Sequence, residues 1–158
     1  MWLAGRGWAV TAVDFSSVAL NKGMRTAESQ GAETVNRIVW VDADLVDYVP
    51  EPASYELALV IYLQVRAAQR HVVLRRAVES LVPGGVLLVV GHDTANLTAG
   101  VGGPQDASVL FTPEDVVSDL ATSGTTVRVE KAERVLRPVD SEARPAIDAL
   151  VRAVALGE

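Results

Sequence analysis

Short apolar runs separated by stretches with helical spacing make up most of the chain. Runs of β-branched and other apolar residues predict buried strands, and apolar residues three or four positions apart predict helices. Strands are predicted at residues 8–15, 36–42, 55–63, 86–91, 127–136 and 146–155, and helices at residues 17–30, 67–81 and 112–123. Residues 1–7 are predicted to be the end of a helix that Gly5 or Gly7 closes. The alanines in 146–155 also permit a helix.

Local signals mark the ends of several elements. Ser16 is a good N-cap for the helix that follows it, and Gly23 weakens the middle of that helix. Thr112, with a proline next and an acid three residues on, has the pattern of a capped helix N-terminus. Residues 83–85 read Pro-Gly-Gly, which predicts a turn, and residues 94–110 are predicted to be a long loop.

The order of these elements predicts the fold class. Strands and helices alternate from residue 8 to residue 136, which is typical of an α/β fold with a mainly parallel, three-layer sheet. The last two strands have no helix between them, and we expect them to form an antiparallel hairpin. The length of 158 residues suits one domain, residues 1–158.

Composition and charge narrow the class of protein. Hydrophobic residues make up 49% of the chain and there is no cysteine, so neither disulfides nor thiolate metal sites are expected. The first residues lack a signal-peptide pattern, and the longest apolar run, 57–63, is too short to span a membrane. The net charge is −6, and the arginines at 66, 70, 75 and 76 are interpreted as a solvated helix face. We therefore expect a soluble cytoplasmic protein without nucleic-acid or membrane partners.

Polar residues follow four of the predicted strands. They are Asp14, Asp44, the segment 62–64 and the pair His92–Asp93. In an open α/β sheet, ligands bind outside the carboxyl ends of the strands. A carboxylate after the second strand of a nucleotide-binding sheet is suited to two ribose hydroxyls, because it is an acceptor only. The sequence therefore predicts a ligand site at this edge.

Four stretches in this order resemble the class I, Rossmann-like S-adenosylmethionine-dependent methyltransferases. They are VDFS (13–16), DADL (42–45), YELALVIYL (55–63) and LVPGGVLLVVGHD (81–93). The wider pattern is similar to the small-molecule branch that includes the tellurite-resistance and thiopurine-type enzymes. The resemblance covers nearly the whole chain and implies S-adenosylmethionine as cofactor and a small-molecule methyl acceptor as partner.

The resemblance also implies a role for particular residues. Asp14 would accept hydrogen bonds from the ribose hydroxyls, and Phe15 would lie against the adenine. Asp44 would accept from the adenine amino group, and the Leu45 N–H would donate to a ring nitrogen. Tyr62 would lie near the methionine part of the cofactor. The substrate side would be formed by His92, Asp93 and Asn96. No catalytic residue is assigned, since methyl transfer to a soft nucleophile can proceed by in-line positioning.

One part of the family pattern is missing from this sequence. The family has a first strand and a glycine-rich loop before its first helix, and residues 1–16 match only that helix end and the second strand. The glycines at 5–7 and 100–103 do not replace the loop, and the latter are interpreted as a flexible loop over the site. Either the flanking strands pair directly, or a second copy covers the gap, or the chain is a fragment. We expect a homodimer in the first two cases.

Three other functions compete with methyl transfer. A non-catalytic methyltransferase-like remnant, acting as a binding or structural module, is favoured by the missing glycine loop. A nicotinamide-dependent short-chain reductase would need a lysine four residues after a tyrosine, and none of the three tyrosines has one. A metal hydrolase would need ligand spacing that His71 and His92 do not provide.

Overall fold

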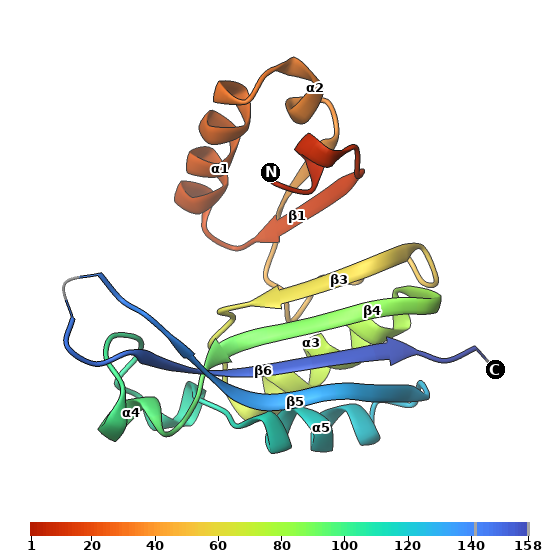
Figure 1. Ribbon diagram of the computed structural model, residues 1–158. Coiled ribbons are helices and arrows are strands. Elements are labelled where there is room, and N and C mark those ends of the chain that lie inside the picture. The colour runs from red at the N-terminus through yellow and green to blue at the C-terminus, as the bar shows by residue number, and fades with distance from the viewer. Residues whose placement is uncertain (141, 158) are drawn as a thin grey trace. The chain divides into compact units, whose positions relative to one another are not determined.

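The computed structural model describes residues 1–140 and 142–157. The chain divides into two compact units, an N-terminal unit, Met1–Val49, and a C-terminal unit, Pro50–Glu158. Each unit has its own sheet, one of two strands and one of four (Figure 1). The single continuous sheet that the sequence predicts is therefore replaced by two, and the expected direct pairing of the flanking strands across a gap does not occur among the described residues.

The N-terminal unit is a small α/β element with parallel strands. Its elements are the 3₁₀ turn Ala4–Arg6, β1 (Val10–Asp14), α1 (Ser17–Ser29), α2 (Ala32–Val35) and β2 (Ile38–Asp42). Val10 pairs with Ile38 at one end of the two strands, and Asp14 with Asp42 at the other. Gly7 has the left-handed conformation expected of a helix cap, with φ of 93°. Packing explains the glycine at position 23, because a Cβ added to Gly23 would lie 2.7 Å from the Trp40 ring.

The C-terminal unit contains a mixed four-stranded sheet. Its elements are β3 (Tyr55–Ile61), α3 (Ala67–Glu79), β4 (Leu81–His92), α4 (Asn96–Ala99), the 3₁₀ turn Ala107–Val109, α5 (Pro113–Ala121), β5 (Val127–Arg137) and β6 (Ala146–Ala155). The strand order is β3-β4-β6-β5. The β3–β4 pair is parallel, and the other two pairs are antiparallel (Figure 1). The antiparallel terminal hairpin is confirmed, but the sheet is mixed rather than mainly parallel.

Two helices cover one face of this sheet. Leu74 and Val78 of α3, with Val116 of α5, share one buried core with Leu87 and Val89 of β4. Both helices therefore pack on the face to which alternate β4 residues point, and the unit has two layers rather than the predicted three. This core holds β4 and the β5–β6 hairpin in place, and with them the polar residues at the strand ends.

The two predicted N-caps are confirmed, but some interpretations fail. The turn predicted at residues 83–85 is wrong, because these residues lie within β4, at an irregularity of its pairing with β3. The Ser16 hydroxyl accepts from the Ala19 N–H at 3.2 Å, and Thr112 and Asp115 form a reciprocal capping box. The interpretation of Arg70 as part of a solvated face is wrong, because it is 7% exposed and its Nε lies 2.6 Å from an Asp119 oxygen. The predicted loop 94–110 contains the short helix α4 and a 3₁₀ turn.

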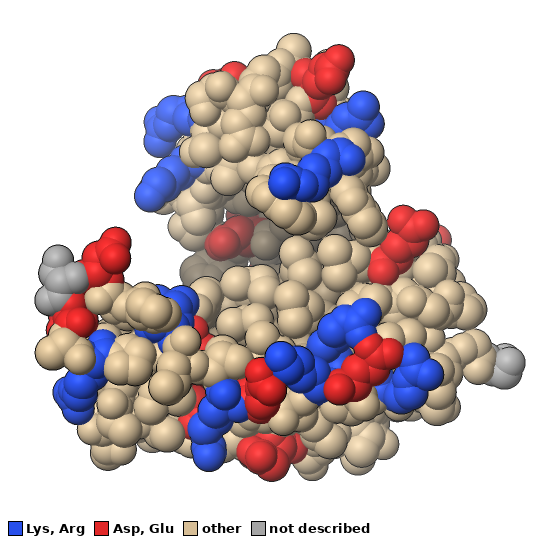
Figure 2. Space-filling model, in the orientation of Figure 1, with Lys and Arg blue, Asp and Glu red and all other residues tan. Residues whose placement is uncertain are grey.

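The two edges of the four-stranded sheet differ in polarity. Charged side chains of both signs are interleaved along the edge strand β5 (Figure 2), where Arg128 pairs with Glu130 and Lys131 with Glu133. The opposite edge strand, β3, has Leu59 and Ile61 exposed by 46% and 45%. Interleaved charge protects an edge strand from pairing with another chain, so β5 is protected and β3 is not.

The described residues show no helix that is long and apolar enough to cross a membrane. Within the same residues, no group of three or more His, Cys, Asp or Glu side chains is placed to hold a metal ion.

Candidate functional site

The carboxyl end of the two-stranded sheet carries three aspartates, Asp14, Asp42 and Asp44, which we call the acidic edge. The Asp14 Oδ1 accepts from the Ser16 N–H at 2.8 Å, and the Asp44 Oδ1 accepts from the Val46 N–H at 2.8 Å. Both are turn contacts to the backbone two residues further on. Within residues 1–140 and 142–157 the second oxygen of Asp14 accepts no hydrogen bond, so it is available to a ligand.

Two neighbours of the acidic edge are also available. The Leu45 N–H donates no hydrogen bond within the described part of the chain. Phe15 directly follows β1, and 67% of its surface is exposed. An acceptor, a donor and an aromatic face thus occur together at the ends of β1 and β2. This donor and acceptor set fits a nucleoside with ribose hydroxyls and a purine ring.

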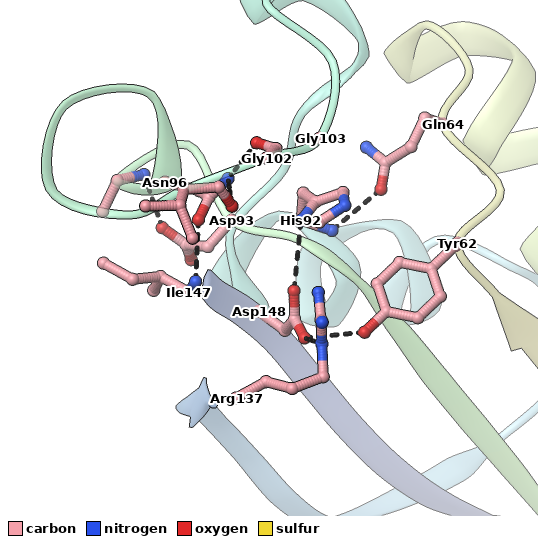
Figure 3. Close-up of polar contacts among 12 residues, drawn as sticks. Tyr62, Gln64, His92, Asp93, Asn96, Gly102, Gly103, Arg137, Ile147 and Asp148 are labelled. Carbon is pink, nitrogen blue, oxygen red and sulfur yellow. Dashed lines mark hydrogen bonds and ion pairs between the residues drawn. The ribbon is translucent and has the colours of Figure 1, made fainter. Parts of the chain in front are cut away.

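The carboxyl end of the parallel pair β3–β4 carries a different arrangement. Four side chains, Tyr62, His92, Arg137 and Asp148, form a connected set that we call the buried polar network (Figure 3). The Asp148 Oδ2 accepts from the Tyr62 hydroxyl at 2.7 Å and from the Arg137 Nε at 2.8 Å. The Asp148 Oδ1 lies 3.2 Å from the His92 Nδ1. One carboxylate therefore organises three side chains from three different segments.

Because the Asp148 carboxylate is buried, it is suited to hold neighbouring side chains in place. Asp148 is 1% exposed, and an isolated charge there would be costly. Arg137 balances that charge, and the hydrogen bond to Asp148 raises the pKa of the Arg137 guanidinium. Neither the Asp148 Oδ1 nor the His92 Nδ1 makes a hydrogen bond of good geometry to any described residue, each other included. Their 3.2 Å separation is that of an ion-pair contact.

Tyr62 stands at a strained position beside His92. Its φ is 53°, in the left-handed region that non-glycine residues rarely occupy. The Tyr62 and His92 ring centroids are 5.1 Å apart. Burial raises the pKa of the Tyr62 hydroxyl, and the hydrogen bond to Asp148 raises it further. The hydroxyl therefore stays protonated and remains a donor to Asp148.

Asp93 and Asn96 have their polar atoms engaged by the chain itself. Asp93 is fully buried, accepts from the Ala95 N–H at 2.8 Å and pairs with the Arg134 Nε at 2.9 Å. The Asn96 side chain donates to the Gly102 carbonyl and accepts from the Ile147 N–H, both at 2.8 Å (Figure 3). These contacts tie the segment after α4 to the start of β6. A contact with substrate stays a prediction for both residues.

The glycine segment after α4 approaches His92 closely. Gly103 has φ of 76°, and an added Cβ would lie 2.7–2.9 Å from the Cγ, Cδ2 and Nε2 of His92. Gln64 fixes the strand end from the other side, since its Oε1 accepts from the His92 N–H at 2.8 Å while its amide donates to the Val109 carbonyl. The segment interpreted from sequence as a flexible loop is thus held by Asn96 and fitted to His92.

The structure brings together some predicted site residues and adds two. The Tyr62 and His92 rings are in contact. In the N-terminal unit, Asp14 and Asp44 each contact the backbone of their own turn. Arg137 and Asp148 were missed by sequence reasoning. Asp148 had a usable signal, because it is the one acid in the apolar strand AIDALVRAVA.

Comparison with known proteins agrees with this fold. No family model and no curated protein matches the sequence. Among solved structures, a protein from Methanosarcina mazei described as a SAM-dependent methyltransferase matches with a TM-score of 0.75 and 14% identity, over 99% of this chain and 86% of that one. The chain has the fold of S-adenosylmethionine-dependent methyltransferases.

Two further solved structures also match this chain. The N-methyltransferase NodS from Bradyrhizobium japonicum matches with a TM-score of 0.64 and 19% identity, over 93% of this chain and 73% of that one, and NodS has also been solved with S-adenosylhomocysteine bound. The [4+2]-cyclase SpnF matches with a TM-score of 0.71 and 12% identity, over 96% of this chain and 67% of that one. At these identities the likeness concerns the fold, and the activity has to be argued from the site.

Proposed function

We propose that this chain transfers a methyl group from S-adenosylmethionine to a small-molecule acceptor. The observation that carries the proposal is the likeness of fold over 99% of the chain to a SAM-dependent methyltransferase. The acidic edge supports it, because one oxygen of Asp14 and the Leu45 N–H have no partner among the described residues. When bound, S-adenosylmethionine would supply the methyl group on a sulfonium.

Four residues of the N-terminal unit would hold the nucleoside part of the cofactor. The free oxygen of Asp14 would accept from the ribose hydroxyls, while its other oxygen keeps the bond to the Ser16 N–H. Phe15 would lie against the adenine, and Asp44 and the Leu45 N–H would hold its amino group and a ring nitrogen. For Tyr62, a place near the methionine part stays a prediction that the resemblance implies. In this scheme each contact in the N-terminal unit adds to the local turn bonds without replacing them.

The acceptor would lie on the side of His92, Asp93 and Asn96. Asp93 and Asn96 would act by fixing the segment after α4, since their polar atoms already have partners in the chain. His92 has its Nε2 side against the Gly103 backbone. A small acceptor, as in the branch with the tellurite-resistance and thiopurine-type enzymes, is the substrate class that we propose.

The likeness to a [4+2]-cyclase shows that this fold also occurs in a protein described by another activity, so the fold does not by itself establish methyl transfer. A second candidate therefore has to be tested. The second candidate is a methyltransferase-like module that binds a partner or has a structural role, without methyl transfer. One measurement distinguishes the two candidates, namely binding of S-adenosylhomocysteine.

We also propose a homodimer, on the basis of the unprotected edge strand β3. β3 has a strand neighbour on one side, and Leu59 and Ile61 are exposed, whereas the other edge strand is charged. A second copy pairing along β3 would satisfy its edge groups and cover these side chains. Sedimentation velocity over a range of concentrations tests this. A folded monomer at every concentration would contradict it.

The deciding experiment for the proposed function is calorimetric titration of S-adenosylhomocysteine into the full chain. Asp14→Asn is the sharpest variant, because asparagine can still accept from the Ser16 N–H but has no second acceptor oxygen for the ribose. We expect it to weaken binding about tenfold, as the loss of a charge-assisted hydrogen bond does. Asp42→Asn removes the same charge at the same edge and is the matched control, with binding changed less than about twofold.

Each outcome of this titration is informative. Binding by the wild type that falls in Asp14→Asn but not in Asp42→Asn supports the proposed cofactor site. Equal effects of the two substitutions would mean that only charge near the edge matters, and the ribose role would be wrong. No binding by a chain that melts cooperatively would favour the non-catalytic module.

A further inference from the structure

We infer that His92 is a general base for acceptors that lose a proton on methylation, with Asp148 as its positioning residue. The inference rests on the proposed function and deepens it, because it names the chemical class of the acceptor. That class is a hydroxyl, amine or thiol, as opposed to a thioether or tertiary amine. It also gives a catalytic role to a side chain that the sequence placed near the substrate without assigning it such a role.

The first observation is the pairing of two buried atoms. The His92 Nδ1 and the Asp148 Oδ1 are 3.2 Å apart, and neither makes a hydrogen bond of good geometry to any described residue, each other included. Asp148 already accepts from Tyr62 and Arg137 through its other oxygen. The Oδ1 is therefore left for a donor, and His92 is the side chain that faces it (Figure 3).

This pairing decides which ring nitrogen carries the proton. A carboxylate oxygen can only accept, so a neutral His92 is stabilised with its proton on Nδ1. Its Nε2 then carries a lone pair and can take a proton. When it does, the imidazolium formed lies against the Asp148 carboxylate. The arrangement of base and orienting acid is the one that general-base catalysis needs.

The second observation is the close approach of a glycine to the other side of the ring. Gly103 passes so close to His92 that an added Cβ would meet the ring within 2.9 Å at Nε2 and 2.7 Å at Cδ2. Its φ of 76° also favours glycine. Asn96 holds this segment through the Gly102 carbonyl. The chain thus fixes a glycine where any other residue would cover or displace the ring that has to act.

The ring is also fixed along its own strand and from its face. Gln64 accepts from the His92 N–H, and the Tyr62 ring lies at a centroid distance of 5.1 Å. His92 has 12% of its side chain exposed, so it is neither free in solvent nor sealed in the core. A base of this kind needs a defined orientation, and these contacts supply it.

The proposed methyl transfer breaks two bonds and forms two. The bond between the acceptor atom and its hydrogen breaks, and the proton moves to the His92 Nε2. The electron pair left on the acceptor atom forms the bond to the methyl carbon, and the methyl–sulfur bond breaks with its electrons remaining on sulfur. The His92 imidazolium, held by Asp148, then returns the proton to water. No oxidant or reductant is required.

The charged groups around His92 come from several elements. Asp148 from β6 faces Nδ1, the Tyr62 hydroxyl and Arg137 from β5 share the other Asp148 oxygen, and Asp93 with its partner Arg134 follows His92 along the chain. Asp148 is the carboxylate nearest to the ring nitrogen, so it is the group to change when the positioning of His92 is tested.

The first test needs no acceptor. The chain has two histidines, so nitrogen NMR of the imidazole rings, with His71→Gln for assignment, reports on His92 directly. We expect neutral His92 to carry its proton on Nδ1, and Asp148→Asn to abolish this preference. His71 is the internal control, because its Nδ1 is 3.8 Å from Asp119 and its side chain is 36% exposed. A proton on the Nε2 of neutral His92 would overturn the inference.

The second test compares two probe acceptors, phenol and thiophenol. Thiophenol is largely ionised at mildly alkaline pH and needs no base, whereas phenol does. His92→Gln should lower the phenol rate about a hundredfold, as loss of a general base does, and the thiophenol rate less than about tenfold. His71→Gln should change neither rate. Equal losses with both probes would show that His92 only positions the acceptor.

These tests separate the inference from the proposed function. S-adenosylhomocysteine binding reports on the cofactor site and does not depend on the protonation of His92. If the cofactor binds and His92 has the other tautomer, the general base is wrong and the methyltransferase stands. If the cofactor does not bind, the proposed function fails whatever the NMR result.

Discussion

The two units hold their carboxylates in opposite ways. At the acidic edge, Asp14 and Asp44 each accept one backbone N–H from the residue two positions later. In the C-terminal unit, Asp93 and Asp148 are 0% and 1% exposed, and each is paired with an arginine of β5. The first arrangement needs only a turn. The second needs strands that are distant in sequence to lie side by side.

This difference separates binding from positioning. A carboxylate held by a local turn keeps an oxygen for an outside donor, so Asp14 is suited to a ligand. The Asp148 carboxylate has neighbours at both oxygens, Tyr62 and Arg137 at one and His92 at the other. It is therefore suited to fix a side chain that acts in its place. Substitutions in the C-terminal unit should consequently cost more stability than those at the acidic edge.

The largest effect is expected for Arg137→Met. The Arg137 side chain is 43% exposed, but the change leaves the buried Asp148 carboxylate without its cation, and an unpaired buried charge costs about 3 kcal/mol of unfolding free energy. Urea unfolding followed by circular dichroism measures it. Arg128→Met on the same strand also removes an exposed arginine, but its partner Glu130 is 30% exposed, so the change should cost less than about 0.5 kcal/mol. Equal losses would contradict the distinction between buried and exposed carboxylates.

A smaller loss is expected for Asn96→Ala. The substitution leaves the Gly102 carbonyl and the Ile147 N–H without their side-chain partner, which should cost about 2 kcal/mol. Hydrogen exchange at the Ile147 amide should become faster, because its acceptor is gone. Asn36→Ala, at an exposed position, is the control and should be nearly neutral. Unchanged exchange at Ile147 would show that Asn96 does not hold the start of β6.

Tyr62→Phe should cost about 1 kcal/mol near neutral pH, through the lost hydrogen bond to Asp148. Because folding raises the pKa of Tyr62, the wild type has this contribution below the ordinary tyrosine pKa of about 10. The contribution is lost as pH rises through the raised folded pKa. The unfolding free energies of the two proteins should therefore converge in strong alkali.

Measuring unfolding at several pH values checks that convergence, and the difference in tyrosinate absorbance between wild type and Tyr62→Phe gives the Tyr62 titration itself. A gap in stability that stays constant at all pH values would mean that ring packing, and not the hydroxyl, explains the loss.

The smallest effect is expected for Asp44→Ala, at the acidic edge. Only one exposed turn contact to the Val46 N–H is lost, so the cost should be about 0.5 kcal/mol or less. Tryptophan fluorescence is a suitable probe, because Trp2, Trp8 and Trp40 all belong to the N-terminal unit. A loss as large as that of Asn96→Ala would show that Asp44 has a structural role that its contacts do not explain.

Features that depend on neighbours in sequence could be predicted from the sequence. The caps at Ser16 and Thr112, the left-handed Gly7 and the six strands follow from local hydrogen bonds, backbone conformation and apolar runs. Burial of Arg70 could not be predicted, because its partner Asp119 lies on another helix. The division into two sheets was also missed, since an apolar strand reads the same whichever strand it pairs with.

For the candidate site the same division holds. The acidic edge was visible in the sequence, since a carboxylate at a strand end needs only its own turn to be placed. The buried polar network was only half visible, because Tyr62 and His92 follow apolar strands, while Asp148 and Arg137 reach them from the β5–β6 hairpin. The sequence by itself determined which residues stand at the ends of strands. Tertiary structure decided which of them share a proton or a charge, because hydrogen bonds and ion pairs depend on distances of about 3 Å that only the packed strands set.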